Sequence, residues 1–111
     1  QGDGLYNPGP IIPLGQIPTS VATGDLNNDG FDDIVVAFGQ SDQIRVFLNN
    51  QANNFNQSGD YSVGVFPLSI GVGDLNNNGL LDLAVANATS NNVSILLNTG
   101  NGSFQNATNY A

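Results

Sequence analysis

The chain has 111 residues and a formal net charge of −8, because nine aspartates face a single basic side chain, Arg45. This balance leaves no positive surface for nucleic acid or anionic lipid, so neither partner is expected. Insertion into a membrane is not expected either, because no apolar run in the sequence approaches the roughly 20 residues that span a bilayer. The chain has no Cys and no His, which removes disulfides, thiol nucleophiles and the commonest general base. Few kinds of catalytic site can be built without these residues, so we expect a non-enzymatic domain. Since 40% of its residues are hydrophobic, we expect this domain to fold.

The sequence repeats itself with a period of 49 residues. Several short strands within a unit of this length are typical of the blades of a β-propeller. We therefore predict an all-β chain with two tandem units, residues 16–64 and 65–111. The segments that match between the two units are 18–30 with 67–79, 33–37 with 82–86, and 44–49 with 93–98.

Each unit carries the pattern of four antiparallel strands. Its first strand alternates apolar with small or polar residues, and its second is apolar on both faces. Polar residues of hairpin length separate the second strand from the third, and no segment shows the 3.6-residue periodicity of a helix. The predicted strands are 20–26, 33–38, 43–49 and 55–61 in the first unit, and 69–75, 82–87, 92–98 and 104–110 in the second.

The N-terminal residues 1–15 add one strand-like element to the two units. Tyr6 precedes Phe55 by 49 positions, so residues 6–15 align with the fourth strand of the first unit. Three prolines within this stretch would prevent it from lying in the centre of a sheet. We predict that residues 1–15 form an edge strand or a connector to another subunit.

Two acidic loops, residues 25–33 and 74–82, join the first two predicted strands of each unit. Counted from the first Asp, oxygen-bearing side chains occupy positions 1, 3, 5 and 9, and Gly occupies position 6. This spacing lets one turn point several short side chains inward, while Gly takes the positive-φ corner and the carbonyl of position 7 adds a ligand. The candidate ligands are Asp25, Asn27, Asp29, Phe31 and Asp33 in the first loop and Asp74, Asn76, Asn78, Leu80 and Asp82 in the second.

An all-oxygen site of flexible geometry suits Ca²⁺ better than Mg²⁺. An EF-hand is excluded, because its Glu at position 12 would fall on Val36 or Val85. The alternative is a plain turn, since Asp, Asn and Gly dominate turns, but two copies in register favour metal binding. The first loop has three carboxylates at ligand positions and the second has two, so we expect the second site to be weaker.

The segments Asp25-Leu-Asn-Asn-Asp-Gly-Phe-Asp-Asp-Ile34 and Asp74-Leu-Asn-Asn-Asn-Gly-Leu-Leu-Asp-Leu83, each followed by a Val/Ala strand, carry a family resemblance. They resemble the FG-GAP/VCBS-type repeats of integrin α-subunit propellers, propeller lectins and large secreted adhesins. The resemblance implies that each unit is a blade whose calcium loop joins its first two strands. It also implies a secreted, calcium-stabilised module with a structural or adhesive role.

Two blades cannot bury both faces of their sheets, so we expect them to join others. The predicted partner is a second copy, bound head to tail in a ring or a filament, unless the chain is a piece of a longer propeller. Extracellular proteins and glycans are further candidate partners. The alternative function is a carbohydrate-binding lectin in which Tyr6, Tyr61, Tyr110 and Phe66 stack on sugars, and a hydrolase is the weakest, because ligation accounts for its carboxylates. Candidate glycosylation sites are Asn56, Asn87, Asn92, Asn101 and Asn106.

Overall fold

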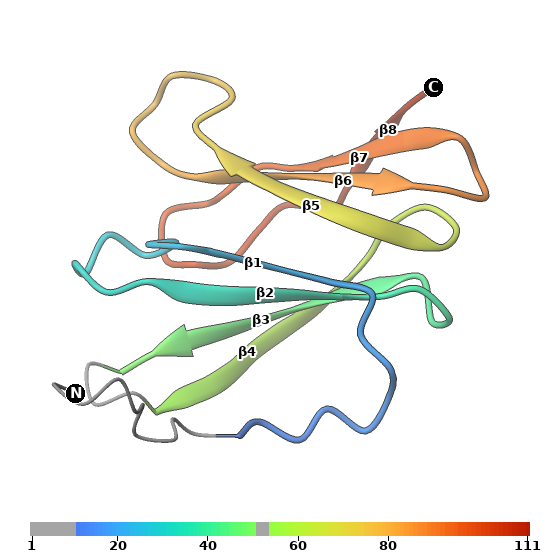
Figure 1. The fold of residues 1–111 in the computed structure, drawn as a ribbon. Helices are drawn as coiled ribbons and strands as arrows, with labels where there is room; N and C mark the ends of the chain where they lie inside the picture. The colour runs from blue at the N-terminus through green and yellow to red at the C-terminus, as the bar shows by residue number, and fades with distance from the viewer. Residues whose placement is uncertain (1–10, 51–53) are drawn as a thin grey trace, which may run out of the picture.

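The computed structural model describes residues 11–50 and 54–111, and within these ranges all regular structure is β-strand, as the sequence predicted. The strands form two four-stranded antiparallel sheets, with the orders β1-β2-β3-β4 and β5-β6-β7-β8, stacked as two layers (Figure 1). We call the first sheet blade 1 and the second blade 2. The strands are β1 (Ser20–Gly24), β2 (Asp33–Phe38), β3 (Gln43–Asn49), β4 (Phe55–Ser62), β5 (Pro67–Gly73), β6 (Asp82–Asn87), β7 (Asn92–Leu96) and β8 (Thr108–Tyr110).

The 49-residue repeat is preserved in the pairing of the strands. In blade 1, Val35 of β2 lies opposite Val46 of β3, and in blade 2 their counterparts Ala84 and Ile95 form the same pair. The hairpin turns before β3 and β7 also match, because the residue preceding each strand, Asp42 or Asn91, has a positive φ. Asp and Asn tolerate this conformation better than most residues. The two blades are therefore copies in register as well as in sequence.

Several strands end earlier than the sequence predicted. β1 and β5 end at Gly24 and Gly73, two residues short of the leucines that were expected to close them. The reason is local, because those leucine amides donate to aspartate side chains instead of to the strand ladder. In blade 2, β7 stops at Leu96, and the predicted fourth strand is reduced to an isolated bridge at Phe104 and the three residues of β8.

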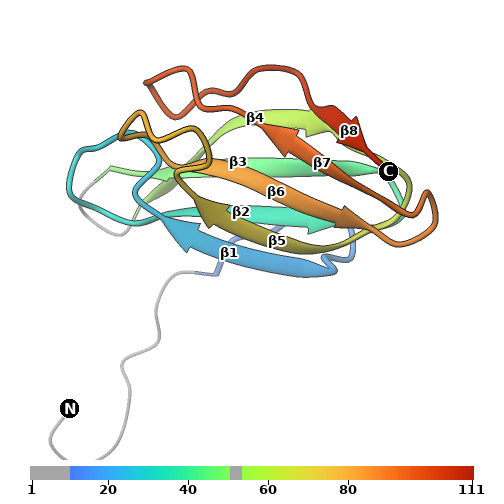
Figure 2. The same ribbon diagram turned by 90° about the horizontal axis from the view of Figure 1, so that it is seen from above.

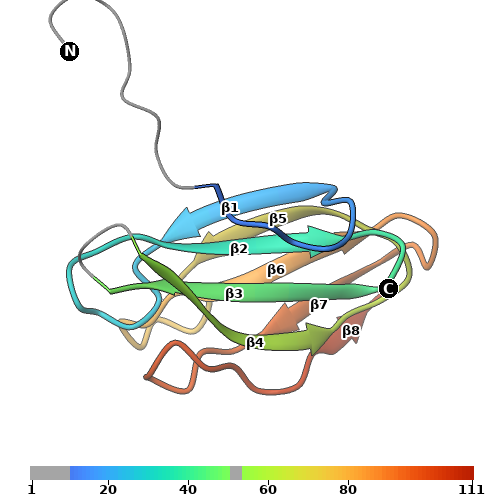
Figure 3. The same ribbon diagram turned by 90° about the horizontal axis from the view of Figure 1, so that it is seen from below.

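The main core lies between the blades, which overlie one another when the molecule is viewed along the stacking direction (Figures 2 and 3). Alternate residues of β2 and β3 point from blade 1 into this core, as expected for strands with both faces covered. Blade 2 contributes alternate residues of β6 and β7 from its near side. The buried members of this core are Leu26, Val35, Ala37, Ile44, Val46, Leu83, Val85, Leu96 and Phe104.

The opposite face of blade 1 carries a second apolar cluster. Val36, Phe38 and Phe47 are buried there, and Ile12 and Leu14 of the N-terminal segment pack against them. Residues 11–15 are not part of a β-strand, and the rest of the predicted N-terminal element lies outside the described residues. Among the described residues, no helix is long and apolar enough to cross a membrane.

The single basic side chain, Arg45, lies on this same face. Its Nε donates to Asp60 Oδ1 at 2.7 Å, and its Nη1 donates to the Leu14 carbonyl at 3.2 Å. The guanidinium also stacks over the Phe38 ring, with 5.0 Å between Cζ and the ring centroid. Because Arg45 is engaged in this way on the far side of blade 1, its charge is not available to the acidic loops.

Candidate metal centre

The first acidic loop is organised by its aspartate side chains. Asp25 follows β1, and its two carboxylate oxygens accept hydrogen bonds from the amides of Asp29 (3.1 Å) and Gly30 (2.8 Å). Asp33 begins β2 and accepts from the amides of Leu26 and Asn49, both at 2.8 Å. Each carboxylate thereby holds two separate points of the backbone, and the loop is fixed by its own acidic residues.

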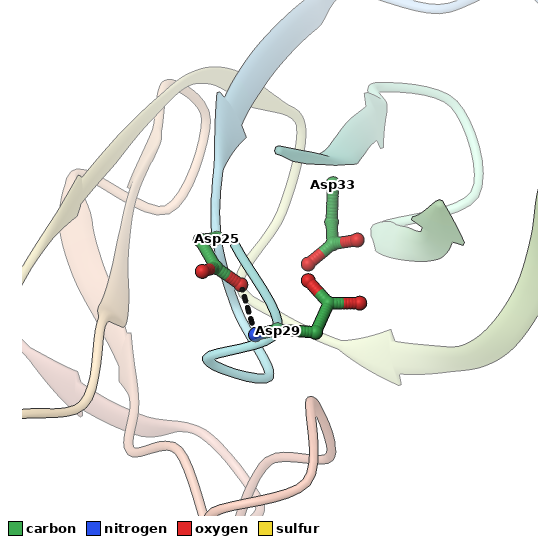
Figure 4. A group of neighbouring side chains, drawn as sticks. All are labelled: Asp25, Asp29 and Asp33. Atoms are coloured by element: carbon green, nitrogen blue, oxygen red, sulfur yellow. Dashed lines mark hydrogen bonds between the residues drawn. The ribbon is translucent and has the colours of Figure 1, made fainter. Parts of the chain in front are cut away.

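Three of the predicted ligands converge in this loop. One oxygen each of Asp25, Asp29 and Asp33 lies within 4.8 Å of the other two. Figure 4 shows the three side chains gathered at the loop. The Asn27 amide lies beside them: with its nitrogen facing the acids, Nδ2 donates to Asp29 Oδ1 at 3.0 Å and to Asp25 Oδ1 at 3.2 Å. Turned over, the same amide adds an oxygen to the three carboxylates. Four side chains of the donor set therefore meet at one point.

The pKa shifts in the loop reflect this crowding. Burial of Asp33, which is 0% exposed, raises its pKa; the Asn49 and Leu26 amides oppose the rise, and repulsion from Asp29 and Asp25 adds to it. For Asp25, burial acts to raise the pKa, but the amides of Gly30 and Asp29 outweigh it and lower the pKa overall. A divalent cation between these side chains would relieve the repulsion.

The second loop repeats the hydrogen bonds of the first almost atom for atom. Asp74 accepts from the amides of Asn78 (3.1 Å) and Gly79 (2.7 Å), and Asp82 accepts from those of Leu75 (3.0 Å) and Asn98 (2.8 Å). The glycines at position 6 have φ of 89° (Gly30) and 85° (Gly79), as the sequence predicted. The difference is chemical, because Asn78 takes the place of an aspartate at position 5.

The remaining predicted ligands also lie in these loops. The Phe31 amide donates to Asp29 Oδ1 at 3.0 Å, and the Leu80 amide donates to Asn78 Oδ1 at 3.1 Å, so position 5 orders position 7 in both loops. Ligation through the carbonyls of Phe31 and Leu80 remains a prediction, as does ligation by Asn76, which is exposed at the tip of the second loop.

Asn98, a residue to which the sequence assigned no role, connects the two loops. Its Nδ2 donates to the carbonyls of Leu26 (2.7 Å), in the first loop, and Leu81 (2.9 Å), in the second. Because the Leu26 amide donates to Asp33 and the Asn98 amide donates to Asp82, hydrogen bonds run continuously from one loop to the other. The signal for it was the Asn that ends the third strand in both units, a repeat with no evident chemistry.

The candidate glycosylation sites lie in different surroundings. Asn56, Asn101 and Asn106 are exposed, and Asn92 is half-buried and accepts hydrogen bonds from Asn87 and Ser90. Asn87 is only 3% exposed, and its amide donates to Asn92 and to Ser94 inside the molecule. A glycan on Asn87 would have to displace this network.

The aromatic residues proposed for sugar stacking are partly engaged elsewhere. The Tyr61 and Phe104 rings form an edge-to-face pair with 5.7 Å between centroids, and the Tyr61 hydroxyl accepts from the Phe104 amide at 3.1 Å. Phe66 packs against Gly39 of blade 1. Tyr110 is 60% exposed, and Tyr6 lies outside the described residues. Tyr61 and Phe66 therefore serve internal packing.

Tandem four-stranded antiparallel sheets, each with the same acidic loop between its first two strands, define a repeat module of the propeller kind. The comparison with family models agrees: residues 25–85 and 74–111 match the FG-GAP-like repeat, and the chain belongs to this family. No curated protein and no solved structure matches the chain.

The donor set in the loops fits a calcium ion. Carboxylate and amide oxygens are ligands of hard cations, and the first loop supplies three carboxylates without a histidine or a thiolate. Asp25, Asn27, Asp29 and Asp33 would hold the ion in the first loop. Once bound, the ion would neutralise clustered negative charge and tie the end of β1 to the start of β2.

Proposed function

We propose that the chain is a calcium-stabilised structural module, without enzymatic activity, that takes part in an extracellular assembly or in adhesion. The observation that carries the proposal is the convergence of the Asp25, Asp29 and Asp33 carboxylates within 4.8 Å in a chain whose single basic side chain is engaged elsewhere. Such a cluster is unfavourable without a cation and favourable with one. Its position between β1 and β2 makes the ion a clamp on the blade.

The surroundings of this loop favour a structural role over catalysis. Asp33 is buried and uses both oxygens to hold backbone amides, and Asp25 does the same, so neither is placed to exchange protons with a substrate. The ion would therefore act on stability. Ligand linkage raises the free energy of unfolding by about 2.7 kcal/mol when the free ion is at a hundred times its dissociation constant.

The same chemistry supports the extracellular location that we propose. Calcium sites with few carboxylates bind weakly, and the millimolar calcium outside cells would keep even the second loop loaded. The chain has no cysteine, so bound calcium would take the place that disulfides hold in many secreted domains. Secretion can be checked by locating the protein in the cells that produce it.

The experiment that tests the proposal is thermal unfolding with and without calcium. We expect the melting temperature to fall when EDTA removes the ion and to recover when calcium, but not an equal concentration of magnesium, is added back. Isothermal titration should find two sites, the stronger in the first loop. If EDTA leaves the melting temperature unchanged, the loops are plain turns and the proposal is wrong.

The second component of the proposed function is head-to-tail association of the module. The two blades bury one face each against the other, and their outer faces carry exposed large apolar side chains, which mark interaction surfaces when they gather. A heterologous contact of this kind produces a closed ring or a filament, depending on the rotation between copies. Adhesion would then reside in the assembled surface.

Carbohydrate binding is the alternative function, and one observation favours it. A polar groove of about 350 Å³ lies along the outer edges of both blades, with Asp60, Ser62, Asn106 and Asn109 among its lining residues. Hydroxyl, amide and carboxylate groups are suited to the hydroxyls of a sugar. The Tyr61 ring beside the groove already packs edge to face against the Phe104 ring. Binding to a glycan array would support the alternative, and loss of that binding in Asp60→Ala would locate it.

A further inference from the structure

We call the face of blade 1 that packs against blade 2 its front, and the opposite face its back; the front and back of blade 2 are the faces made by the equivalent residues 49 positions later. The stack of two blades therefore leaves the back of blade 1 and the front of blade 2 unpaired. The front face of blade 1 buries Val35, Ala37, Ile44 and Val46 against blade 2, and all four are 0% exposed. Their counterparts, 49 positions later, lie on the side of blade 2 that faces away from blade 1, and none of them is buried. Those counterparts are Ala84, Ala86, Val93 and Ile95.

The back of blade 1 has a hollow that matches the interior of the molecule residue by residue. The hollow has a volume of about 220 Å³ and apolar walls. Six counterparts of its seven lining residues pack in the core between the blades, and the seventh, Pro67, is fully buried. The hollow is thus the counterpart, on blade 1, of the surface with which blade 2 packs against blade 1. Its lining residues are Ile12, Leu14, Pro18, Val21, Ile34, Val36 and Phe47.

Inside the chain the blades are joined by the Phe66 side chain, which we call the plug, packed on Gly39, which we call the socket. The Phe66 ring would contact a Cβ on Gly39 at 3.0 Å, so it lies directly on that glycine. The Phe66 amide donates to Asp42 Oδ1 at 2.9 Å, and Thr19 Oγ1 donates to the carbonyl of the following Pro67 at 2.7 Å. The segment Phe66-Pro67 is therefore seated at one end of the front face of blade 1.

The same plug and the same socket occur again, unfilled by each other, at the two ends of the molecule. The counterpart of Phe66 is Ile17, whose side chain is 72% exposed and is followed by Pro18. The counterpart of Gly39 is Ala88, which lines a hollow of about 400 Å³ on the front of blade 2, together with Val93 and Tyr110. Compared with the internal pair, the plug residue is smaller, Ile in place of Phe, and the socket residue is larger, Ala in place of Gly. The sizes compensate.

We propose that the front face of blade 2 receives the back face of blade 1 of a second copy, with Ile17 and Pro18 of that copy inserted beside Ala88 and Val93. The inference rests on the head-to-tail association proposed above and names its two surfaces. The contact extends an interface that the chain already forms internally. Because the two surfaces differ, each added copy leaves one of each kind open at the ends.

The outer edge of this contact requires one adjustment. Residues 11–13 of the incoming copy lie 49 positions before residues 60–62, and residues 109–111 of the receiving copy lie 49 positions after them. Both segments would therefore compete for the position that residues 60–62 of β4 take between the blades. β8 pairs with β7 over only three residues, whereas β4 pairs with β3 over seven positions. The short strand β8 is the segment that gives way.

Two charge substitutions and their mixture test the contact. Val93→Lys alters the front surface and Ile17→Lys the back, both at exposed side chains, and circular dichroism confirms that each variant is folded. In saturating calcium, sedimentation velocity should show the unaltered chain associating with rising concentration, and each variant alone at the monomer mass of 11.5 kDa. An equal mixture should form dimers and nothing larger, because one intact front then meets one intact back.

The control is Val65→Lys, since Val65 is 45% exposed and lines neither hollow, and this variant should associate as the unaltered chain does. The inference is overturned if the unaltered chain stays monomeric, if the mixture forms no dimer, or if Ile17→Lys still associates while Val93→Lys does not, which would indicate front-to-front pairing. The calcium proposal is judged separately, because EDTA-dependent melting is measured on the monomeric variants.

Discussion

The two acidic loops have the same backbone conformation and differ in charge. In both, the first Asp accepts hydrogen bonds from the amides of positions 5 and 6, and the last Asp accepts one from an amide of the loop and one from the Asn49 or Asn98 amide. Yet the first loop gathers three carboxylates, whereas the second has Asn78 at position 5 and Leu81 where the first has Asp32. The shape of the loop is therefore set by hydrogen bonds, and its charge can vary separately.

The residue at position 8 shows one consequence of this independence of charge from loop shape. Leu81 packs against the core between the blades, and its Cδ1 would lie 3.2 Å from a Cβ on Gly24. Asp32, its counterpart, is exposed on blade 1, and in the part of the chain that the structure describes no neighbouring blade packs against it. The second loop thus carries an interblade contact and the first carries more charge. We expect the first to depend more on calcium.

The largest expected effect comes from removing the buried carboxylate that both loops share. Asp33→Ala, or Asp82→Ala in the second loop, leaves two amides without acceptors and should lower the free energy of unfolding by about 2–6 kcal/mol. Urea unfolding in EDTA measures it, because these hydrogen bonds do not need the ion. Asp32→Ala, at an exposed neighbour, is the control and should change stability by less than about 0.5 kcal/mol. Equal stability of Asp33→Ala and the unaltered chain would contradict a structural role for this carboxylate.

The next effect tests whether the two loops are coupled. Asn98→Ala removes the donor to the Leu26 and Leu81 carbonyls and should cost about 1–3 kcal/mol. It should also weaken calcium binding in the first loop, although Asn98 belongs to blade 2, because the Leu26 backbone holds Asp33. The amide resonance of Gly30 reports the first loop during a calcium titration. Asn101→Ala, at an exposed residue of the same turn, is the control; an unchanged midpoint at Gly30 in Asn98→Ala would show that the loops act separately.

A smaller effect separates charge from shape. Asp29→Asn gives the first loop the side chain of the second, and we expect its calcium affinity to fall about tenfold, or about 1.4 kcal/mol. Asn78→Asp should strengthen the second loop by a similar factor, so that the affinities converge or exchange order. Isothermal titration of the two variants and their double mutant measures both. Equal affinities of the two loops in the unaltered chain would remove the basis of this comparison.

The features that the sequence predicted well are those set by local pattern. The alternation in β1 and the apolar run of β2 required strands, and the position-6 glycine required a positive φ, because these depend on a few neighbouring residues. The period of 49 then carried each prediction from one blade to the other. The acidic loops were found for the same reason.

The features that the sequence did not reveal depend on how the blades lie against each other. The Asn98 side chain bonds to a carbonyl 72 positions earlier, and only the orientation of the blades brings the two together. Likewise, Ile12 and Leu14 lie on the back of blade 1, a placement that no local pattern indicates. The shortness of β8 also depends on tertiary structure, since among the described residues no further sheet packs on the outer face of blade 2 to order its fourth strand.

The smallest expected effect tests whether the two backbones are equivalent. Gly30→Ala and Gly79→Ala each place a Cβ at a positive φ with no other atom within 4 Å, so the cost comes from the backbone alone. It should be about 1 kcal/mol in both loops. Gly73→Ala, which also has open space but no positive φ, is the matched control. Urea unfolding in EDTA compares the three. If Gly30→Ala and Gly79→Ala differ by more than about 0.5 kcal/mol, the loops differ in strain as well as in charge, and unequal calcium binding would no longer be attributable to the aspartate at position 5.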